Sequence, residues 1–211
     1  METFEHKLAR VKTIKLICAT IVVATFALAQ THHQQDVVRR ADLYKSEVDT
    51  LVAHAKDSLL IFVKEPDTDS LIRITDTHRW PDEVELTCNM FFDTKGRLVY
   101  YCEIPFSKSG DWYAEFQHYF DTTGSVLLVV SAVSSFNSGC TEILRQRKKS
   151  YYDTKGKLIS TSSSLTDKDF NPVSTKDCYF NYDFPVTVYP SVQQLPVRVR
   201  QSIARARNVA R

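Results

Sequence analysis

The sequence predicts an α+β fold in which an N-terminal helix packs on an antiparallel β-meander of hairpins. A stripe of apolar residues at helical spacing lies within residues 34–57. Further along, a motif of Asp, two polar residues and Gly occurs three times, beginning at Asp93, Asp121 and Asp153. Apolar and polar residues alternate around the first of these motifs, which is typical of a half-buried antiparallel pair of strands.

The first 29 residues have the composition of a signal peptide. Basic residues precede an uncharged run of 14 residues at 16–29, which fits the ~7–15 of a signal-peptide core and not the ~20 that span a bilayer. Residues 27–29, Ala-Leu-Ala, match the small-x-small pattern that signal peptidase cleaves. We therefore expect an exported chain that begins at Gln30. The alternative is an uncleaved membrane anchor, because tilt and interfacial residues can compensate for a short span.

Charge argues against a nucleic-acid partner. Without residues 1–29, 23 basic and 23 acidic residues remain, so the mature chain lacks the net positive charge that attracts nucleic acid. The C-terminal tail, residues 191–211, is nevertheless basic and contains no acid. We expect a solvated terminal helix there, and the alternative is a contact with an anionic surface or an acidic partner. The arginines of this tail are Arg198, Arg200, Arg205, Arg207 and Arg211.

Residues 30–57 are predicted to form the N-terminal helix. Its apolar residues recur at alternating steps of four and three, which is one stripe of a helix. The expected cover for this stripe is the apolar face of the sheet, although a coiled-coil partner would use the same pattern. The stripe consists of Val37, Ala41, Tyr44, Val48, Leu51 and Ala55.

An antiparallel β-sheet domain is predicted over residues 58–190. It begins with two short strands, residues 59–63 and 70–74, on either side of the turn Glu-Pro-Asp-Thr-Asp. A closing strand is expected over residues 178–184, because apolar residues alternate there. These residues are Cys178, Phe180, Tyr182 and Phe184.

Each Asp-x-x-Gly motif is predicted to close a hairpin with a three-residue loop. Asp suits the first position of a type I turn, and Gly suits the left-handed position after it. In the first hairpin Asp93 then pairs with Arg97, and stepping outward places Cys88 opposite Cys102. Since Cα atoms of such a pair lie ~4.5 Å apart, we predict a Cys88–Cys102 disulfide. A four-residue loop would shift the register and prevent this disulfide.

The hairpins differ in the polarity of their faces. The second has apolar residues on both faces, which predicts a central position, and the third sets basic residues against serine and threonine, which predicts an edge. The segments FDTKGRL, FDTTGSV and YDTKGKL resemble the Tyr-Asp-x-x-Gly-Arg-Leu core of the YD repeats in Rhs-type bacterial shell proteins. The resemblance is confined to these segments and implies a secreted bacterial protein built of hairpins. It implies no toxin or encapsulation role, because the rest of the repeat is missing.

Cys140 and Cys178 are the other two cysteines of the mature chain. An even number of cysteines in an oxidising compartment favours disulfides, and elimination pairs these two. In a plain meander, however, the strand over residues 157–165 would lie between theirs and separate them by ~9–10 Å, too far for a disulfide. Either the strand order differs from a plain meander or the two thiols are free.

The loops that join successive hairpins are expected to meet at the sheet edge opposite the Asp-x-x-Gly turns. They are residues 107–112, 134–142 and 166–172. Loops on a rigid sheet often carry binding groups, and an aromatic side chain among polar ones suits a sugar or a peptide. The alternative is that these residues serve turns, the core and the solvated surface. The candidate ligand-binding residues are Trp80, Ser109, Asp111, Trp112, Asn137, Glu142 and Asp169.

No catalytic residue and no cofactor is predicted. Asp111 and Glu142 offer a hydrolase an acid and a base, but no spacing determines their separation. His118 falls on an apolar strand face and is interpreted as a core histidine. Cleavage after residue 29 would leave a free amine on Gln30 with His32 third, a pattern that binds Cu(II) or Ni(II).

Three functions are consistent with these features. The first is an exported, periplasmic or secreted, non-catalytic binding protein whose partner is a protein or small ligand in the cell envelope. The second is an extracytoplasmic hydrolase that uses loop carboxylates. The third is a structural envelope component anchored by its N-terminal segment, which is the only membrane contact expected. Two close, buried carboxylates in a deep pocket would favour the enzyme, and a shallow aromatic patch would favour binding.

Overall fold

The computed structural model describes most of the chain after residue 31. The chain forms two units, residues 1–40 and residues 41–211. The predicted signal peptide over residues 1–29 and Gln30 lie outside the described residues, so the structure does not test them. The described residues are 32, 34–54, 58–136, 138–174, 176, 178, 180 and 182–209.

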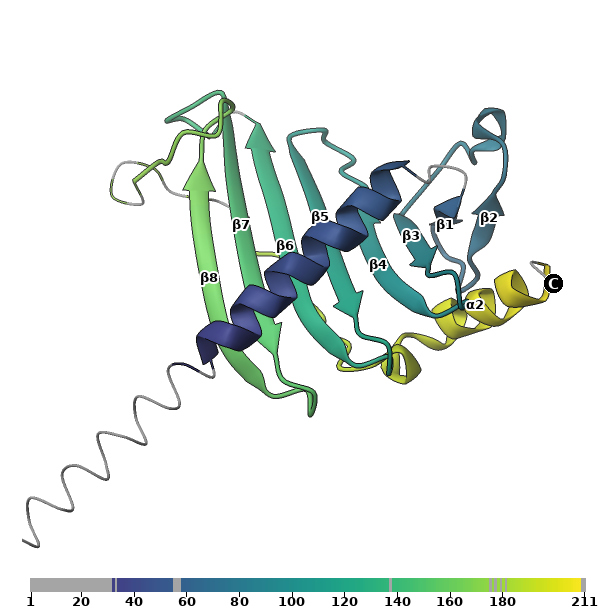
Figure 1. Ribbon diagram of the computed structural model, residues 1–211. Helices are drawn as coiled ribbons and strands as arrows, with labels where there is room; N and C mark the ends of the chain where they lie inside the picture. The colour runs from purple at the N-terminus through teal and green to yellow at the C-terminus, as the bar shows by residue number, and fades with distance from the viewer. Residues whose placement is uncertain are drawn as a thin grey trace, which may run out of the picture. The chain divides into compact units, whose positions relative to one another are not determined.

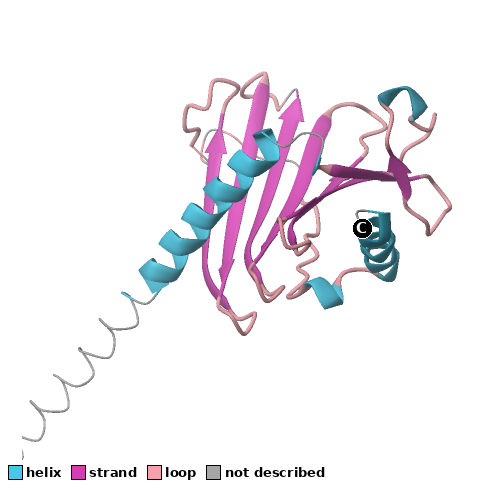
Figure 2. Ribbon diagram, turned by 45° about the vertical axis from the view of Figure 1, so that its right-hand side comes forward, coloured by secondary structure: helices cyan, strands magenta, loops and turns pink. Residues whose placement is uncertain are grey.

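The described strands form one antiparallel sheet in the order β2-β1-β3-β4-β5-β6-β7-β8 (Figure 1). From β3 onward each strand pairs with the next, so the predicted α+β fold with a β-meander is confirmed. The strands are β1 (Leu60–Lys64), β2 (Ile72–Ile74), β3 (Leu86–Phe92), β4 (Leu98–Pro105), β5 (Trp112–Phe120), β6 (Val126–Phe136), β7 (Ile143–Tyr152) and β8 (Leu158–Thr166). Besides the N-terminal helix, the described chain contains the helical elements η2 (Thr77–Arg79), η3 (Val192–Gln194) and α2 (Val197–Val209), and Figure 2 draws helices in cyan.

The predicted N-terminal helix is confirmed over residues 34–54. From Ala41 onward it packs on the sheet, with Ala41 and Val48 both 3% exposed. A hydrogen bond adds to this contact, in which the Tyr44 hydroxyl donates to the Phe120 carbonyl at 2.7 Å. Leu51 belongs to the predicted stripe but is 52% exposed. The helix therefore contacts the sheet through a mixed apolar and polar surface, and less of the stripe is buried than predicted.

All three predicted turns are present, and the Asp carboxylate has the same role in each. In the first, Asp93 Oδ1 accepts hydrogen bonds from the backbone amides of Lys95 and Arg97, both at 2.9 Å. Equivalent bonds form in the second and third turns. The glycine that closes the first turn, Gly96, has a φ of 71°, which lies in the left-handed region that glycine adopts without strain.

The prediction of a Cys88–Cys102 disulfide is wrong, because a β-bulge follows the turn and shifts the register of the two strands. The pair nearest the turn forms as predicted, but Val99 is then an extra residue in β4. Cys88 consequently lies opposite Glu103, and the two cysteines face opposite sides of the sheet. Both are buried and free.

The same irregularity occurs in the other two hairpins. One residue is extra between Val126 and Leu128 in β6, and one between Leu158 and Ser160 in β8. The bulge is thus part of the repeated unit, and in each hairpin it shifts the returning strand by one residue. Because successive side chains alternate between faces, each shift moves a predicted inward-facing set to the other side of the sheet.

The chain covers both faces of the sheet within residues 41–211. The helix from Ala41 lies on the face of Tyr119, whose hydroxyl donates to Asp49 at 2.7 Å. The opposite face carries the main apolar core, to which residues 186–195 and α2 contribute. The buried members of this core are Phe62, Leu71, Cys88, Met90, Leu98, Tyr101, Phe120, Val126, Val129, Tyr152, Leu195, Val199 and Ile203.

Two predictions about the C-terminal part are therefore wrong. The described residues between 178 and 184 form no strand, and the segment instead packs on the face of β5 and β6. The predicted terminal helix is present as α2, but it is not solvated, because its Val199 and Ile203 are 0% and 5% exposed. The helix enters the core on these apolar residues, while Arg200 Nε donates to the Leu195 carbonyl at 3.1 Å.

Replacing Gly96 by Ala is expected to lower the free energy of unfolding by about 1–2 kcal/mol, because a Cβ disfavours the left-handed conformation. No atom lies within 4 Å of the added Cβ, so the effect is conformational rather than steric. Urea denaturation measures it, with Gly96→Asn as the control because Asn tolerates this conformation. Equal stability of the Ala and Asn variants would contradict this account of the turn.

Candidate ligand-binding edge

Strands β4, β6 and β8 all end at one edge of the sheet, as antiparallel alternation requires. We call this the loop edge and define it as residues 106–113, 138–142 and 167–171. In Figure 1 it lies at the upper ends of β6 and β8. The prediction that the loops joining hairpins share an edge is consistent with this strand order.

Three of the predicted site residues form one group on the β4–β5 connection. Asp111 accepts hydrogen bonds from Ser109 Oγ and, at 2.9 Å, from the Tyr182 hydroxyl. Both bonds lower the pKa of the Asp111 carboxyl, and the bond from Ser109 has the larger effect. Beside it, the ring of Trp112 lies 4.6 Å from that of Phe184 and 6.5 Å from that of Tyr182. The group therefore combines an ionised acceptor with aromatic rings.

A row of aromatic side chains extends from this group over β5. Every second residue of the segment after Cys178 contributes a ring to this row. The same alternation of apolar residues led to the prediction of a strand there. Ring centroids of neighbouring members lie between 4.6 and 6.5 Å apart. The row packs against the small cluster of Ala114 and Val133. Its members are Trp112, Phe116, Phe180, Tyr182 and Phe184.

Two other predicted residues, Glu142 and Asp169, belong to a second group. Lys168 Nζ donates to Glu142 Oε2 at 2.8 Å, and this bond lowers the pKa of Glu142. Asp169 is exposed, and its backbone amide donates to Asp167 Oδ1 at 2.9 Å. The structure thus ties the predicted acids to separate partners, and no hydrogen bond or ion pair among the described residues joins Asp111 to either of the others.

The second group contains a fourth copy of the Asp turn, which sequence reasoning missed. Asp167 Oδ1 accepts from the amides of Asp169 and Asn171, both at 2.9 Å, as the other aspartates do. Phe170 occupies the position of glycine with a φ of 65°. Its ring lies 4.5 Å from the guanidinium carbon of Arg145. The missing glycine hid the motif, although the Asp-x-x spacing and the following Asn-Pro were visible in the sequence.

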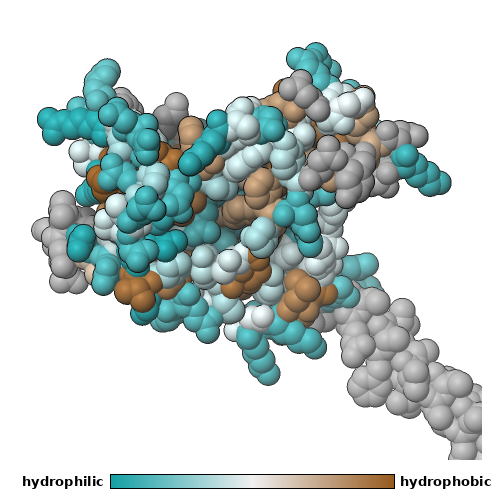
Figure 3. Space-filling model, turned by 180° about the vertical axis from the view of Figure 1, so that it is seen from behind, coloured by the Kyte–Doolittle hydropathy of each residue, from teal (hydrophilic) through white to brown (hydrophobic). Residues whose placement is uncertain are grey.

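Exposed aromatic side chains concentrate at the loop edge. Among the described residues four aromatics are classed as exposed, and three lie there: Phe106 at 58%, Tyr113 at 41% and Phe170 at 71%. The fourth is Trp80, which is 40% exposed and follows η2 in the connection from β2 to β3. No ring contact or side-chain hydrogen bond of the described residues joins Trp80 to the other predicted site residues. Seen from behind, the surface is mostly hydrophilic with small separate hydrophobic patches (Figure 3).

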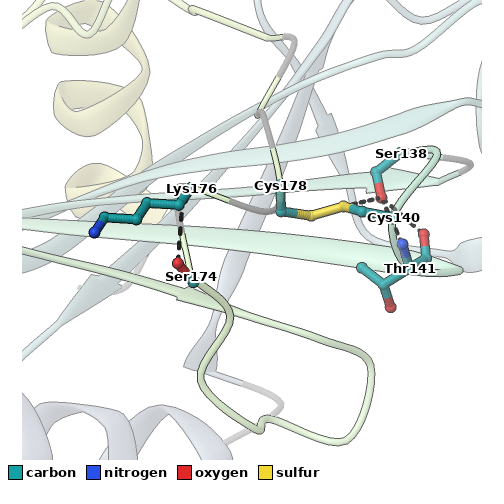
Figure 4. Close-up of a disulfide and its surroundings, with 6 residues drawn as sticks. All are labelled: Ser138, Cys140, Thr141, Ser174, Lys176 and Cys178. Atoms are coloured by element: carbon teal, nitrogen blue, oxygen red, sulfur yellow. Dashed lines mark hydrogen bonds between the residues drawn. A yellow bond between two sulfur atoms is a disulfide. The ribbon is translucent and has the colours of Figure 1, made fainter.

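The Cys140–Cys178 disulfide is present and links the loop edge to the C-terminal segment (Figure 4). The Cα atoms of the two cysteines lie 5.7 Å apart. The conflict between this pairing and a plain meander disappears because Cys178 lies in no strand of the sheet. Ser138 shapes the loop beside the bridge by donating its hydroxyl to the Thr141 carbonyl at 2.7 Å.

His118 is a core residue, as interpreted from the sequence. Its side chain is 0% exposed, and Nε2 lies 3.1 Å from the Thr187 carbonyl oxygen and 3.5 Å from the Tyr189 amide nitrogen. Burial lowers the pKa of His118 to about 4. The ring is therefore neutral at pH 7 and lies beneath the C-terminal segment, whereas Ser109 is exposed and bonded to Asp111. These residues do not form a Ser-His-Asp group.

Comparison with known proteins gives no relative: the chain matches no protein-family model, no curated protein and no solved structure. Within the described ranges, no group of three His, Cys, Asp or Glu residues could hold a metal ion. No helix in the part of the chain that the structure describes is long and apolar enough to cross a membrane. Asn137 and Gln30 lie outside the described residues, and His32 is exposed on the N-terminal helix.

Proposed function

We propose that this chain is an exported, non-catalytic binding protein that holds an extended oligosaccharide along the loop edge. The observation that carries this proposal is the concentration of exposed aromatic side chains there: Phe106 follows β4, Tyr113 lies in β5 and Phe170 follows β8. Four interstrand spacings separate β4 from β8, so these rings are spread over ~19 Å. Exposed aromatic faces on loops of a rigid sheet suit an extended ligand better than a small, enclosed one.

The polar groups at this edge complement the rings. The lowered pKa values of Asp111 and Glu142 keep both carboxylates ionised at neutral pH, where they accept hydrogen bonds from ligand hydroxyls. A hydrolase would need one carboxyl with a raised pKa to act as the general acid. The directions of both pKa shifts therefore favour binding over hydrolysis.

Phe170 supports a contact role most directly. The left-handed backbone conformation of a residue with a Cβ costs about 1–2 kcal/mol, and glycine avoids this cost in the other three turns. Phe170 is nevertheless 71% exposed, so burial of its ring does not compensate for the strain. The backbone of Phe170 is strained, and its exposed ring is oriented by Arg145. This arrangement is expected of a residue that contacts a ligand.

Export is supported by two features. The Cys140–Cys178 bridge is compatible with an oxidising compartment outside the cytoplasm. The basic and then apolar composition of residues 1–29 favours a signal peptide over an anchor. We place the protein in the periplasm or the medium.

Titration with tetrasaccharides, among them the β-1,4-linked tetramers of glucose and of N-acetylglucosamine, tests the proposal. Trp80→Phe leaves Trp112 as the only tryptophan, so its fluorescence reports on the loop edge. We expect saturable binding that Phe170→Asn weakens at least about tenfold, because aromatic anchors dominate binding energy. The same variant is expected to change the free energy of unfolding by at most about 1 kcal/mol, since relief of backbone strain offsets the loss of the Arg145 contact.

Ile72→Ser is the matched control, because Ile72 is a 39% exposed apolar residue on β2, which β1 and β3 separate from β4. Its affinity should equal that of the parent protein. Absence of binding across the panel, or unchanged affinity in Phe170→Asn, would show that the loop edge does not recognise oligosaccharides in this way.

A further inference from the structure

Between the bulge at its start and the turn that follows it, the outer edge of β8 carries neither the charge nor the proline that block a free strand edge. β8 is the last strand in the described sheet and pairs there with β7 alone. Its nine residues, LISTSSSLT, contain no charge and no proline. The other terminal strand, β2, has three residues, one of them Arg73. Short edge strands and charged side chains prevent edge-to-edge pairing, and β8 has neither protection.

Hydrogen bonds at one end of β8 show which backbone groups face outward. The Leu165 carbonyl accepts from the Val173 amide at 2.9 Å and hence points away from β7. By antiparallel alternation, the N–H and C=O groups of Ser163 and Thr161 point the same way. The turn after β8 covers the edge as far as Leu165. Among the described residues, nothing pairs with the outward backbone groups of Thr161 and Ser163.

Positive charge flanks this free stretch on both faces. Arg147 and Lys148 of β7 are exposed, point to opposite faces, and form no ion pair with a described residue. The residues opposite them on β8 are Ser164 and Ser163, which are small and carry no charge. The long basic side chains can therefore extend across β8 toward a strand placed beyond it.

We propose that β8 pairs with an extended acidic segment of another protein, which continues the sheet as an added strand. Its backbone bonds to Thr161 and Ser163, and its carboxylates contact Arg147 on one face and Lys148 on the other. A second copy of this chain fits less well, because two β8 strands would add no acid and would bring two basic β7 strands within ~14 Å. The surface is separate from the loop edge, so this inference is independent of the proposed oligosaccharide site.

Backbone NMR of the exported chain with a blocked heptapeptide tests the pairing. The probe carries two adjacent glutamates among threonine and valine residues, so that one carboxylate faces each side of the added strand, and the control peptide carries lysine in place of glutamate. We expect the acidic peptide to shift the Thr161 and Ser163 amide resonances and slow their hydrogen exchange, and the lysine peptide to do neither. Equal effects of both peptides, or none at these two amides, would overturn the proposal.

Ser163→Pro removes an outward N–H that does not bond to β7, so it should preserve the melting temperature. It should weaken binding of the acidic peptide at least about tenfold. Ser163→Ala is the matched control and should bind as the parent does. Replacing Arg147 and Lys148 by Glu should reverse the preference toward the lysine peptide. A dimer that Ser163→Pro dissociates would assign the edge to a second copy and refute an acidic partner.

Discussion

Removal of the Cys140–Cys178 disulfide is expected to lower the free energy of unfolding by about 4 kcal/mol. The two cysteines are separated by 38 positions, and closing a loop of that length restricts the unfolded chain. The bridge also anchors the start of the segment whose later residues pack in the core with Leu195 and Val199. Since typical domains are stable by about 5–15 kcal/mol, this loss is a large fraction of the total.

Urea denaturation of the Cys140→Ala, Cys178→Ala double variant measures this effect, and the parent protein in reductant should behave in the same way. Cys88→Ala is the control for loss of a cysteine side chain, because Cys88 is free and buried and its burial raises the thiol pKa to about 12. Reductant should therefore destabilise Cys88→Ala as much as the parent. A parent midpoint that does not respond to reductant would rule out a stabilising bridge.

Acidification from pH 6.5 to pH 4 is expected to remove about 3 kcal/mol of stability through His118. Burial lowers the pKa of this side chain from 6.5 to about 4 in the folded protein. Above pH 6.5 the ring is neutral in both states and has no effect on stability. Below pH 6.5 the unfolded chain binds a proton that the folded chain does not, so stability decreases until the folded ring is protonated near pH 4.

His118→Gln removes the titration and retains a side-chain donor for the Thr187 carbonyl. Unfolding free energies from denaturation at several pH values should show the slope in the parent and not in this variant. The lowered pKa values of Asp93, Asp153 and Asp167 affect stability below their ordinary value of 3.8, outside this window. Parallel pH profiles for parent and variant would show that His118 is not the source.

The charged and polar groups that face His118 do not alter the sign of this prediction. The rings of Tyr101 and Tyr189 lie 6.0 and 5.1 Å away, and the hydroxyls of both tyrosines donate to Glu103. The Glu103 carboxylate is thus engaged with these hydroxyls rather than with the imidazole. Desolvation therefore has the largest effect on the pKa of His118.

Part of the candidate site was predictable because its contacts are local. Ser109 and Asp111 are two residues apart and bond to each other, and Trp112 follows directly. Their partner Tyr182 comes from a segment about 70 residues later, and no pattern in the sequence indicated that it would cross this face. Phe170 was missed because its backbone adopts a conformation that its residue type does not predict.

The sequence by itself determined the helix from residue 34, the three Asp-x-x-Gly turns and the meander, because each depends on contacts between residues close in the chain. Tertiary structure decided which side chains share a face, since one extra residue such as Val99 reverses every position beyond it. It also decided that Cys178 lies in no strand of the sheet, which allows it to meet Cys140. Burial of apolar surface on the second face selects that path, and this energy depends on residues that only the folded chain brings together.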